Sequence, residues 1–406
     1  MEKYSISWEK SQIILKFWAD KILTVMLMQF FSLKTRIVLG EGSLSYIKSV
    51  AKKHSRVLIF SSKSMRVHGF LNEAMNYVED ANAEVEAITG VPAEPSYEYV
   101  ESIMPKVREF QPDLIIALGG GSVIDVAKAV KVFYDAPELK FEEVAFISRF
   151  EKPKPIPKLK TPLIAIPSTS GAGSEVSAAS VLKKGDIKYN LVSFEIAPEF
   201  AILDPRLPRT MPKEVARNSG LDALVHGIEA YTTTAATPFS DAVAIKAIKL
   251  VYKWLPLSVQ GDEKARENVH YAATMAGIAF LNARLGLCHS LSHKAAWIAP
   301  HGLLNAIFLP YVMEFNMRSE YARKRYAEIA RELNLRTAQE LIEVIKEFNE
   351  MLGVPKLSEL VSEDEFLSKL DEMSEKAYHD PLINFNPVEP SAEEIKELYK
   401  RAFYGE

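Results

Sequence analysis

The stretch Asp113-Leu-Ile-Ile-Ala-Leu-Gly-Gly-Gly-Ser-Val-Ile-Asp-Val-Ala-Lys128 joins a short apolar run to a glycine-rich turn and then to a helical pattern. It predicts a buried strand over residues 113–118 and a helix over residues 122–133. Glycines at such a junction let the backbone approach a phosphate group, and the unpaired N–H groups that begin the helix attract anions. Ile124 stands where the G-x-G-x-x-G pattern has its last glycine, so an ordinary tight turn remains an alternative.

Strand-like and helix-like segments alternate on both sides of this unit. Such alternation is typical of βαβ units, in which helices cover a parallel sheet. The Pro- and Lys-rich segment 150–162 predicts a surface loop. The other expected strands cover residues 35–39, 57–61, 83–89 and 163–166, and the other expected helices cover residues 72–79 and 97–110.

The pattern changes after Asp204-Pro205 and becomes almost wholly helical. We therefore predict an α/β, Rossmann-like dinucleotide-binding domain over residues 28–208 and an all-α C-terminal domain over residues 209–406. Two domains agree with the length, because 406 residues are too many for one ordinary hydrophobic core. The expected helices of the second domain cover residues 213–233, 240–252, 263–282, 288–297, 318–333 and 338–351.

Bulk composition excludes several classes of partner. The net charge of -4 leaves no basic excess to neutralise a nucleic-acid backbone, so we expect no nucleic-acid partner. Cys288 is the only cysteine, which excludes an internal disulfide and fits a reducing, cytoplasmic location.

The N-terminal segment needs a separate interpretation. Residues 13–31 are apolar, but Lys16, Asp20 and Lys21 interrupt them. A charged residue near the centre of a membrane span costs about 3 kcal/mol, so we expect no membrane association. We interpret residues 1–27 as an N-terminal extension, either a helix or sequence translated from upstream of the native start.

The second half contains a histidine cluster. Asp222 and His226 are spaced i, i+4 on a predicted helix, as are His289 and His293, and residues at this spacing share one helix face. His301 follows in a Pro-His-Gly sequence that predicts a turn. Three imidazoles and one carboxylate suit a divalent ion with an open position for substrate, and this chemistry does not choose between Fe²⁺ and Zn²⁺. For any one histidine, burial in the core is the alternative.

A second polar loop follows the strand expected over residues 163–166. The loop Pro167-Ser-Thr-Ser-Gly-Ala-Gly-Ser-Glu175 is rich in hydroxyl groups that can bind ribose, phosphate or an amide. Because the carboxyl ends of parallel strands meet at one sheet edge, we expect this loop to lie beside the turn at residues 119–122. An ordinary Ser/Gly loop is the alternative.

Together these motifs resemble those of the iron-containing (group III) alcohol dehydrogenases. The resemblance runs from about Phe31 to the C-terminus, roughly nine-tenths of the chain. Between His293 and His301 the chain is about two residues shorter than is usual in the family. The motifs that carry the resemblance are Arg36–Gly42, Gly119–Lys128, Pro167–Glu175, Ala201–Pro205, Gly220–His226 and Gly286–Gly302.

The resemblance implies a fold shared with dehydroquinate synthase, with metal and cofactor in the cleft between the two domains. It implies that Asp222, His226, His289 and His301 are the metal ligands, and that His293 is a catalytic histidine that relays a proton. The positions that match the family's cofactor contacts are Gly120, Gly121, Ser122, Asp125, Thr169, Ser170, Ser174 and Lys188.

The expected activity is hydride transfer between a small primary alcohol or aldehyde and NAD(P), with Fe²⁺ as the metal and Zn²⁺ as the alternative. We expect a small-molecule substrate and a homo-oligomer, a dimer. A zinc glycerol dehydrogenase and a hydroxyacid–oxoacid transhydrogenase on the same fold are alternative enzymes. A non-enzymatic protein that binds a metal and a nucleotide is the least favoured alternative.

The end of the second strand predicts the cofactor preference. Many NAD-using relatives carry an aspartate at the position of Ser62, and a carboxylate there would repel the 2′-phosphate of NADP. This chain has Ser61-Ser62-Lys63-Ser64 instead, with Arg66 close by. Hydroxyl groups and cations complement a phosphate, so we expect NADP(H) to be accepted at least as well as NAD(H).

Overall fold

The computed structural model describes residues 29–185 and 187–405. The described residues from Leu33 onward belong to one compact unit. The extension predicted over residues 1–27 lies outside the described residues. Among the helices that are described, none combines the length and the apolar character that crossing a membrane requires.

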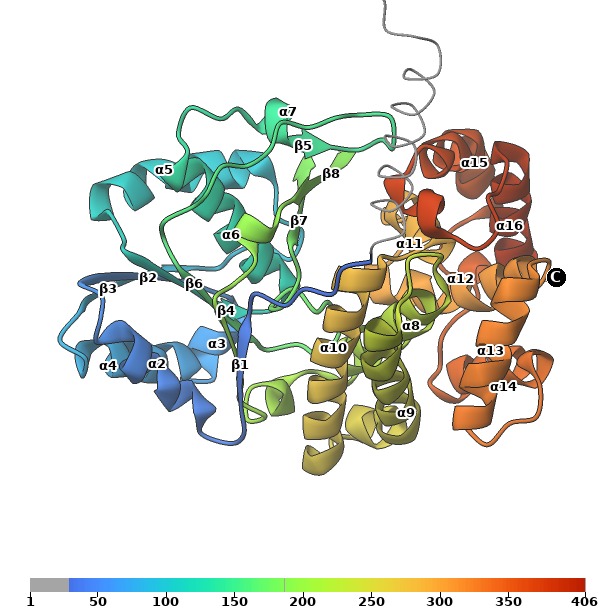
Figure 1. The fold of residues 1–406 in the computed structure, drawn as a ribbon, viewed down its shortest axis with the longest axis horizontal. Coiled ribbons are helices and arrows are strands. Elements are labelled where there is room, and N and C mark those ends of the chain that lie inside the picture. The colour runs from blue at the N-terminus through green and yellow to red at the C-terminus, as the bar shows by residue number, and fades with distance from the viewer. Residues whose placement is uncertain (1–28, 186, 406) are drawn as a thin grey trace, which may run out of the picture. The chain divides into compact units, whose positions relative to one another are not determined.

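A parallel sheet of six strands forms the centre of the first half, in the order β1-β9-β6-β4-β2-β3 (Figure 1). Its strands pair in parallel throughout. All six residues of β4 are buried, as expected for a central strand that is covered on both faces. The strands are β1 (Arg36–Leu39), β2 (Arg56–Ser61), β3 (Glu84–Thr89), β4 (Leu114–Gly119), β6 (Leu163–Pro167) and β9 (Phe200–Leu203).

Helices cover both faces of this sheet because its side chains alternate between two cores. Leu58 and Phe60 of β2 belong to the core under α5 and α6, whereas Val57 and Ile59 belong to the core under α2 and α4. The α/β architecture predicted from the sequence is confirmed. The helices are α2 (Tyr46–Ala51), α3 (Lys63–Val67), α4 (Phe70–Glu79), α5 (Tyr97–Phe110) and α6 (Gly121–Asp135).

A small antiparallel sheet, in the order β5-β8-β7, was not predicted. Its longer strands, β7 (Ala179–Lys184) and β8 (Ile187–Val192), are only partly buried and carry several lysines, so they lack the apolar run of a buried strand. The short β5 (Ala145–Phe146) follows helix α7 (Phe141–Val144). Residues 151–160 form no helix or strand, which confirms the predicted loop.

The second half is built from helices, as predicted (Figure 1). Between β9 and α8 the chain passes through a 3-10 turn, Pro208–Thr210. Helices α12, α15 and α16 were not predicted. The helices are α8 (Lys213–Thr232), α9 (Pro238–Gln260), α10 (Glu263–Ala283), α11 (Leu287–Lys294), α12 (His301–Asn316), α13 (Glu320–Glu332), α14 (Ala338–Met351), α15 (Glu363–Tyr378) and α16 (Ala392–Tyr404).

Two predictions around the histidine cluster are wrong. Helix α11 ends at Lys294 rather than continuing to residue 297. His301 does not lie in a turn but is the first residue of α12, with Pro300 at the N-cap. Proline favours a helix start because its fixed φ suits the position and it has no N–H group to leave unpaired.

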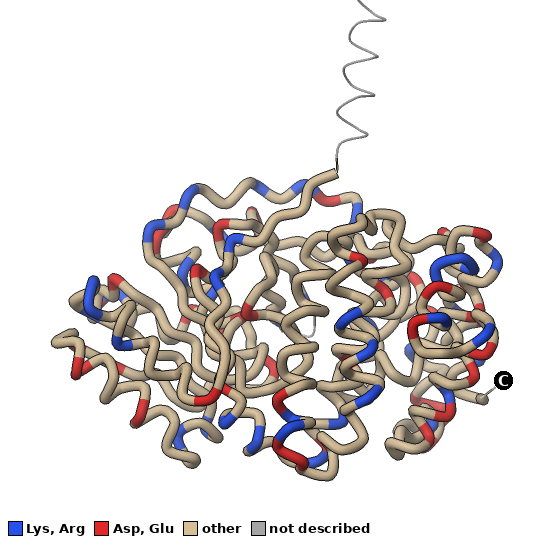
Figure 2. The backbone as a smooth tube through the Cα atoms, turned by 60° about the horizontal axis from the view of Figure 1, so that its bottom comes forward, with Lys and Arg blue, Asp and Glu red and all other residues tan. Residues whose placement is uncertain are grey.

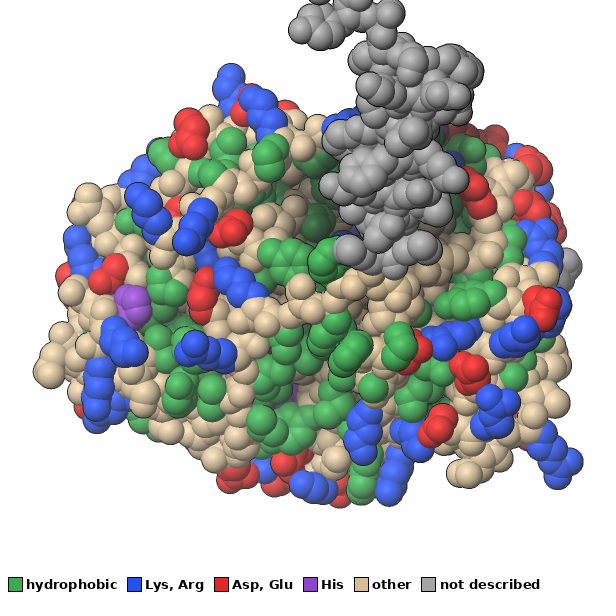
Figure 3. Space-filling view, viewed as in Figure 1, with side chains coloured by type: hydrophobic (Ala, Val, Ile, Leu, Met, Phe, Trp, Pro, Cys, Tyr) green, Lys and Arg blue, Asp and Glu red, His purple; other side chains and the backbone are tan. Residues whose placement is uncertain are grey.

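Charged and hydrophobic groups are distributed differently over the surface. Acidic and basic residues are interspersed rather than gathered by sign (Figure 2). Hydrophobic side chains gather on the face that carries β1 and α10 (Figure 3). Leu39, at the end of the edge strand β1, is 57% exposed.

Helices α8 and α12 approach closely at Gly302. A Cβ atom at this position would lie 2.9 Å from the Cβ of Asp222 and would collide with the carbonyl oxygen of Asn218. Gly302 directly follows His301, so this approach also sets the distance between His301 and Asp222.

We predict that Gly302→Ala lowers the free energy of unfolding by about 1–3 kcal/mol, the usual cost of overpacking, and weakens metal binding. Thermal unfolding and metal content after reconstitution would measure the two effects. Gly261→Ala is the matched control: Gly261 has a φ of +99° but open space around it, so it isolates backbone strain. Equal metal content in both variants would contradict the prediction.

Candidate functional site

The two polar loops lie side by side at the carboxyl edge of the sheet, as expected. Gly119 of β4 is paired with Pro167 of β6, and the N–H of Ser168 donates to the carbonyl of Gly119 at 2.9 Å. Helix α6 begins at Gly121, so its unpaired N–H groups open at this edge.

The loop after β6 reaches the helical half between α8 and α10. A Cβ atom at Gly171 would lie only 2.5 Å from the carbonyl oxygen of Ser219 in α8. The hydroxyl of Ser170 lies 3.1 Å from Nδ1 of His270, a buried histidine of α10. Burial lowers the pKa of His270 to about 4, so its imidazole is neutral at neutral pH.

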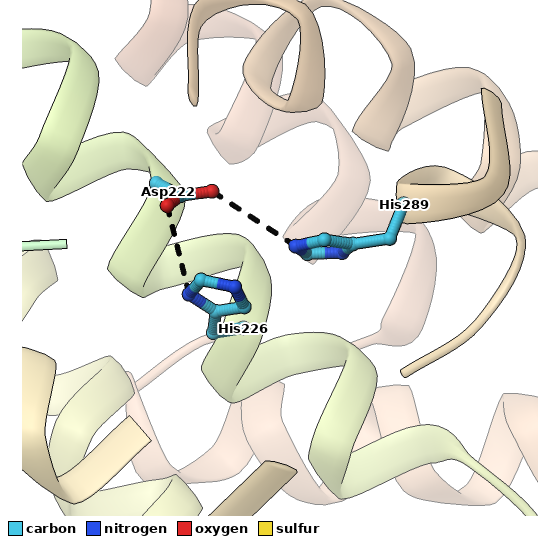
Figure 4. Close-up of side chains that lie close together, drawn as sticks. All are labelled: Asp222, His226 and His289. Carbon is cyan, nitrogen blue, oxygen red and sulfur yellow. Dashed lines mark ion pairs between the residues drawn. The ribbon is translucent and has the colours of Figure 1, made fainter. Parts of the chain in front are cut away.

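Three residues of the histidine cluster come together in the helical half. One ligating atom each of Asp222, His226 and His289 lies within 4.8 Å of the others, and all three residues are buried (Figure 4). Oδ2 of Asp222 is 3.9 Å from Nδ1 of His226, and Oδ1 is 3.9 Å from Nε2 of His289. Helix α8 supplies the first two side chains from one face, and α11 supplies the third.

His301 approaches the same carboxylate from α12. Its Nε2 atom lies 3.7 Å from Oδ1 of Asp222, and its ring packs edge-on against that of His289 at 5.2 Å. Atoms that bind one ion at about 2.0–2.3 Å stand about 3–4 Å from each other. The spacing of Oδ1 of Asp222 from Nε2 of His289 and from Nε2 of His301 is therefore compatible with a shared divalent ion.

Each of the three imidazoles has its Nδ1 atom engaged by the protein. The partners are the carbonyl of Gly171 for His226 at 3.2 Å, the Glu229 carboxylate for His289 at 2.5 Å, and the Ser292 hydroxyl for His301 at 3.2 Å. Where Nδ1 carries the proton, the lone pair is left on Nε2, the arrangement that metal-binding histidines require.

Burial also favours the neutral imidazole. It is the main reason that the pKa values of His289 and His301 lie well below the usual value, and the neighbouring imidazoles lower them further. Both rings are therefore uncharged at neutral pH, and an uncharged ring has a lone pair to give to a cation.

Sequence reasoning missed Glu229. This buried side chain lies three residues after His226 on α8, and besides His289 it accepts a hydrogen bond of 2.7 Å from the N–H of Cys288. Burial raises the pKa of Glu229 to about 7, although hydrogen bonds from backbone N–H groups oppose this rise. The i, i+3 spacing from His226 was the available signal.

Asn305 was also missed, although it lies four residues after His301 on α12. Its Nδ2 atom is 2.8 Å from Oδ1 of Asp222, 3.0 Å from Nε2 of His289 and 3.1 Å from Nε2 of His301. The amide is fully buried, and these three distances place it beside the donor atoms of Asp222, His289 and His301.

His293 lies next to this cluster. Its ring stacks on that of His301 with centroids 5.0 Å apart, and its Nδ1 atom lies 3.7 Å from Oδ2 of Asp380. Asp380 also forms an ion pair with Lys294 at 2.8 Å. Burial raises the pKa of Asp380, but Lys294 and His293 outweigh burial and keep that carboxylate ionised.

The remaining predicted cofactor residues lie on several elements. Ser122 donates from its hydroxyl to the carbonyl of Ala93 at 2.5 Å. Asp125 is half-buried beside the second sheet, where it accepts a hydrogen bond from the N–H of Val181, and desolvation raises its pKa to about 6 against the effect of Lys128. This contact ties α6 to β7.

Lys188 and Ser62 lie on different elements, β8 and the N-cap of α3. Lys188 lies on β8. Its positive charge also lowers the pKa of His301, although burial and the imidazoles of His293 and His289 have larger effects. Ser62 follows β2 directly; its N–H donates to the carbonyl of Leu118, and its hydroxyl caps α3. Lys63 and Ser64, which follow it, are exposed.

Comparisons with known proteins agree on one family. Residues 34–205 match the family described as iron-containing alcohol dehydrogenase, and residues 216–403 match the C-terminal region of the Fe-containing alcohol dehydrogenase family. An alcohol dehydrogenase of Thermococcus barophilus is 97% identical over 377 residues, which cover 93% of this chain and 100% of that protein.

Two further relatives support this result. The NADPH-dependent butanol dehydrogenase of Clostridium saccharobutylicum is 41% identical over 392 residues, which cover 93% of this chain and 99% of that protein. The structure of an iron-containing alcohol dehydrogenase from Thermococcus thioreducens is similar with a TM-score of 0.92 at 73% identity, and the match covers 93% of this chain and 100% of that one.

The fold and the buried carboxylate–imidazole cluster thus define a metal-dependent oxidoreductase class. The chain belongs to the iron-containing alcohol dehydrogenase family, which confirms the resemblance. It is an enzyme that acts on the CH–OH group of alcohols, and membership of the family implies a metal ion and a nicotinamide cofactor.

We predict that Glu229→Gln weakens metal affinity about 10–100-fold, because carboxylates that orient ligating histidines contribute this much. Competition with a chelator of known affinity would measure the change. Glu328→Gln is the matched control, because Glu328 accepts a hydrogen bond from Tyr231 of the same helix α8. Affinity within twofold of the parent in Glu229→Gln would contradict a role in orienting His289.

Proposed function

We propose that Asp222, His226, His289 and His301 hold one divalent ion, Fe²⁺, with Zn²⁺ as the alternative. The observation that carries this proposal is the convergence of the three imidazoles on the Asp222 carboxylate, with Nε2 of His289 and of His301 facing Oδ1 and each Nδ1 held by a protein partner. Three nitrogen donors and one carboxylate suit either metal, and they leave a coordination position for substrate.

The protein would divide the reaction between its two halves. A metal ion held by the helical half would supply a Lewis acid for the oxygen of an alcohol or aldehyde, and a nicotinamide held by the α/β half would supply or take the hydride. The N-terminus of α6 and the loop 167–175 would bind the cofactor with Gly120, Gly121, Ser122, Thr169, Ser170 and Ser174, at the sheet edge where such folds bind nucleotides. Asp125 and Lys188 would complete this site.

His293 would move the proton in this scheme. Because its Nδ1 atom lies toward Asp380, Nε2 is the ring atom available for transfer. The substrate class is a small primary alcohol and the corresponding aldehyde, which the butanol dehydrogenase relative supports. The homodimer and the domain limits 28–208 and 209–406 stay predictions.

The proposal predicts that His226→Ala loses both the bound metal and the activity while the fold remains. Metal analysis after anaerobic reconstitution with Fe²⁺, together with aldehyde reduction assays, would measure this. His54→Ala is the control, since His54 pairs with Asp113 at the start of the sheet strands. Full metal content in His226→Ala would remove His226 from the ligand set.

Cofactor preference provides a second prediction. Ser62 directly follows β2 and carries no carboxylate, and the butanol dehydrogenase relative is NADPH-dependent. We expect NADP(H) to be used at least as well as NAD(H). A kcat/KM at least tenfold higher with NADH, a difference of about 1.4 kcal/mol, would contradict this reading.

The variant Ser62→Asp should shift the ratio of kcat/KM values toward NADH, because its carboxylate repels a 2′-phosphate. Aspartate also caps helices well, so α3 should be retained. Ser62→Asn, which keeps the size and the cap without the charge, is the matched control. An unchanged ratio in Ser62→Asp would exclude Ser62 as the discriminating position.

A further inference from the structure

Asp380 is a buried carboxylate at the start of a 3-10 turn, Pro381–Phe385, and lies against one face of α11. Its Oδ1 atom accepts hydrogen bonds from the N–H of Leu382 at 3.0 Å and from the hydroxyl of Ser290 at 3.4 Å. Its Oδ2 atom lies 2.8 Å from Nζ of Lys294 and 3.7 Å from Nδ1 of His293. Three of these four partners, Ser290, His293 and Lys294, therefore lie on one face of α11.

We propose that Asp380 is a positioning residue that fixes the ring of His293 through Nδ1, so that Nε2 stays directed toward the reacting groups. This inference rests on the proposed function of His293. Burying a carboxylate is costly unless it is paired, and Lys294 supplies the pairing charge. The carboxylate can then stay ionised and attract Nδ1 of His293 across 3.7 Å, with Nε2 free to exchange a proton.

The segment that carries Asp380 is held from the α/β half of the molecule. The backbone N–H of Arg149 donates to the carbonyl of His379 at 2.8 Å, and its guanidinium lies 4.5 Å from the ring centre of Tyr378. The same side chain is 7% exposed and pairs with Glu389 at 2.9 Å. These contacts flank Asp380 and restrict its movement, as a positioning role requires.

A purely structural role would give different consequences. As the cap of the 3-10 turn and a partner of Lys294, Asp380 would contribute to stability, and its loss would affect every property of the enzyme together. A positioning role affects the step in which His293 takes part. It leaves the metal content and the binding of aldehyde and cofactor nearly unchanged.

The test compares Asp380→Asn, His293→Ala and the double variant in the metal-loaded enzyme. We expect Asp380→Asn to lower kcat about tenfold, with the KM for aldehyde within twofold of the parent and an unchanged metal content. In the His293→Ala background the same change should have no further effect on kcat. Glu375→Gln is the control, because Glu375 is an exposed carboxylate of α15 that lies near His379.

A second variant distinguishes loss of the carboxylate charge from loss of the folded structure. Asp380→Glu keeps a carboxylate, and its kcat should return to within threefold of the parent even if Asp380→Asn is unstable. In the zinc-loaded protein with ¹⁵N-labelled histidine, Asp380→Asn should also shift the Nδ1 resonance of His293, which reports the contact independently of turnover.

Three results would overturn the inference. These are a kcat loss in Asp380→Asn that multiplies with that of His293→Ala, a loss of metal in Asp380→Asn, or a kcat in Asp380→Glu as low as in Asp380→Asn. If His293→Ala is slow and Asp380→Asn is as fast as the parent, only the inference fails. If His293→Ala itself keeps its kcat, the proton-relay role in the proposed function fails.

Discussion

The hydrogen bond between the carbonyl of Gly171 and Nδ1 of His226 joins the two halves of the site. It forms because the loop after β6 lies directly against α8. The backbone of Gly171 is so close to Ser219 that no side chain would fit between them. The same loop follows the sheet edge suited to phosphate, and the same histidine lies beside Asp222. A shift of this loop would therefore disturb the candidate metal site and the candidate nucleotide site together.

The groups around the candidate ligands matter as much as the ligands. Glu229 and Ser292 engage the Nδ1 atoms of His289 and His301, and Asn305 contacts Asp222 from α12. Buried polar groups are costly when unpaired, so this cluster is stable only when each member has its partner. The outer carboxylate and hydroxyl thus select the imidazole tautomer that can bind a cation, and they restrict the rotation of each ring.

Burial has opposite effects on the two kinds of ionisable group at the site. It lowers the pKa values of the clustered histidines and raises those of Glu229 and Asp125, so it favours the neutral form of each. Asp380 is the exception, because Lys294 and His293 keep it ionised. These environments therefore favour uncharged imidazoles in the cluster, and an uncharged imidazole has a lone pair to give to a cation.

The sequence by itself determined the parallel sheet, the helical second half and the residues of the histidine cluster. Apolar runs, period-3.6 patterns and i, i+4 spacing are local signals, and each can be read within one element. Only the tertiary structure decided that Glu229, Asn305 and Asp380 belong with the site. It also showed that His301 begins a helix, and it revealed the sheet formed by β5, β7 and β8. Asp380 lies 87 residues beyond His293, and no spacing rule links them. Their contact depends on how α11 packs against the 3-10 turn Pro381–Phe385, which is set by the burial of both segments in one core.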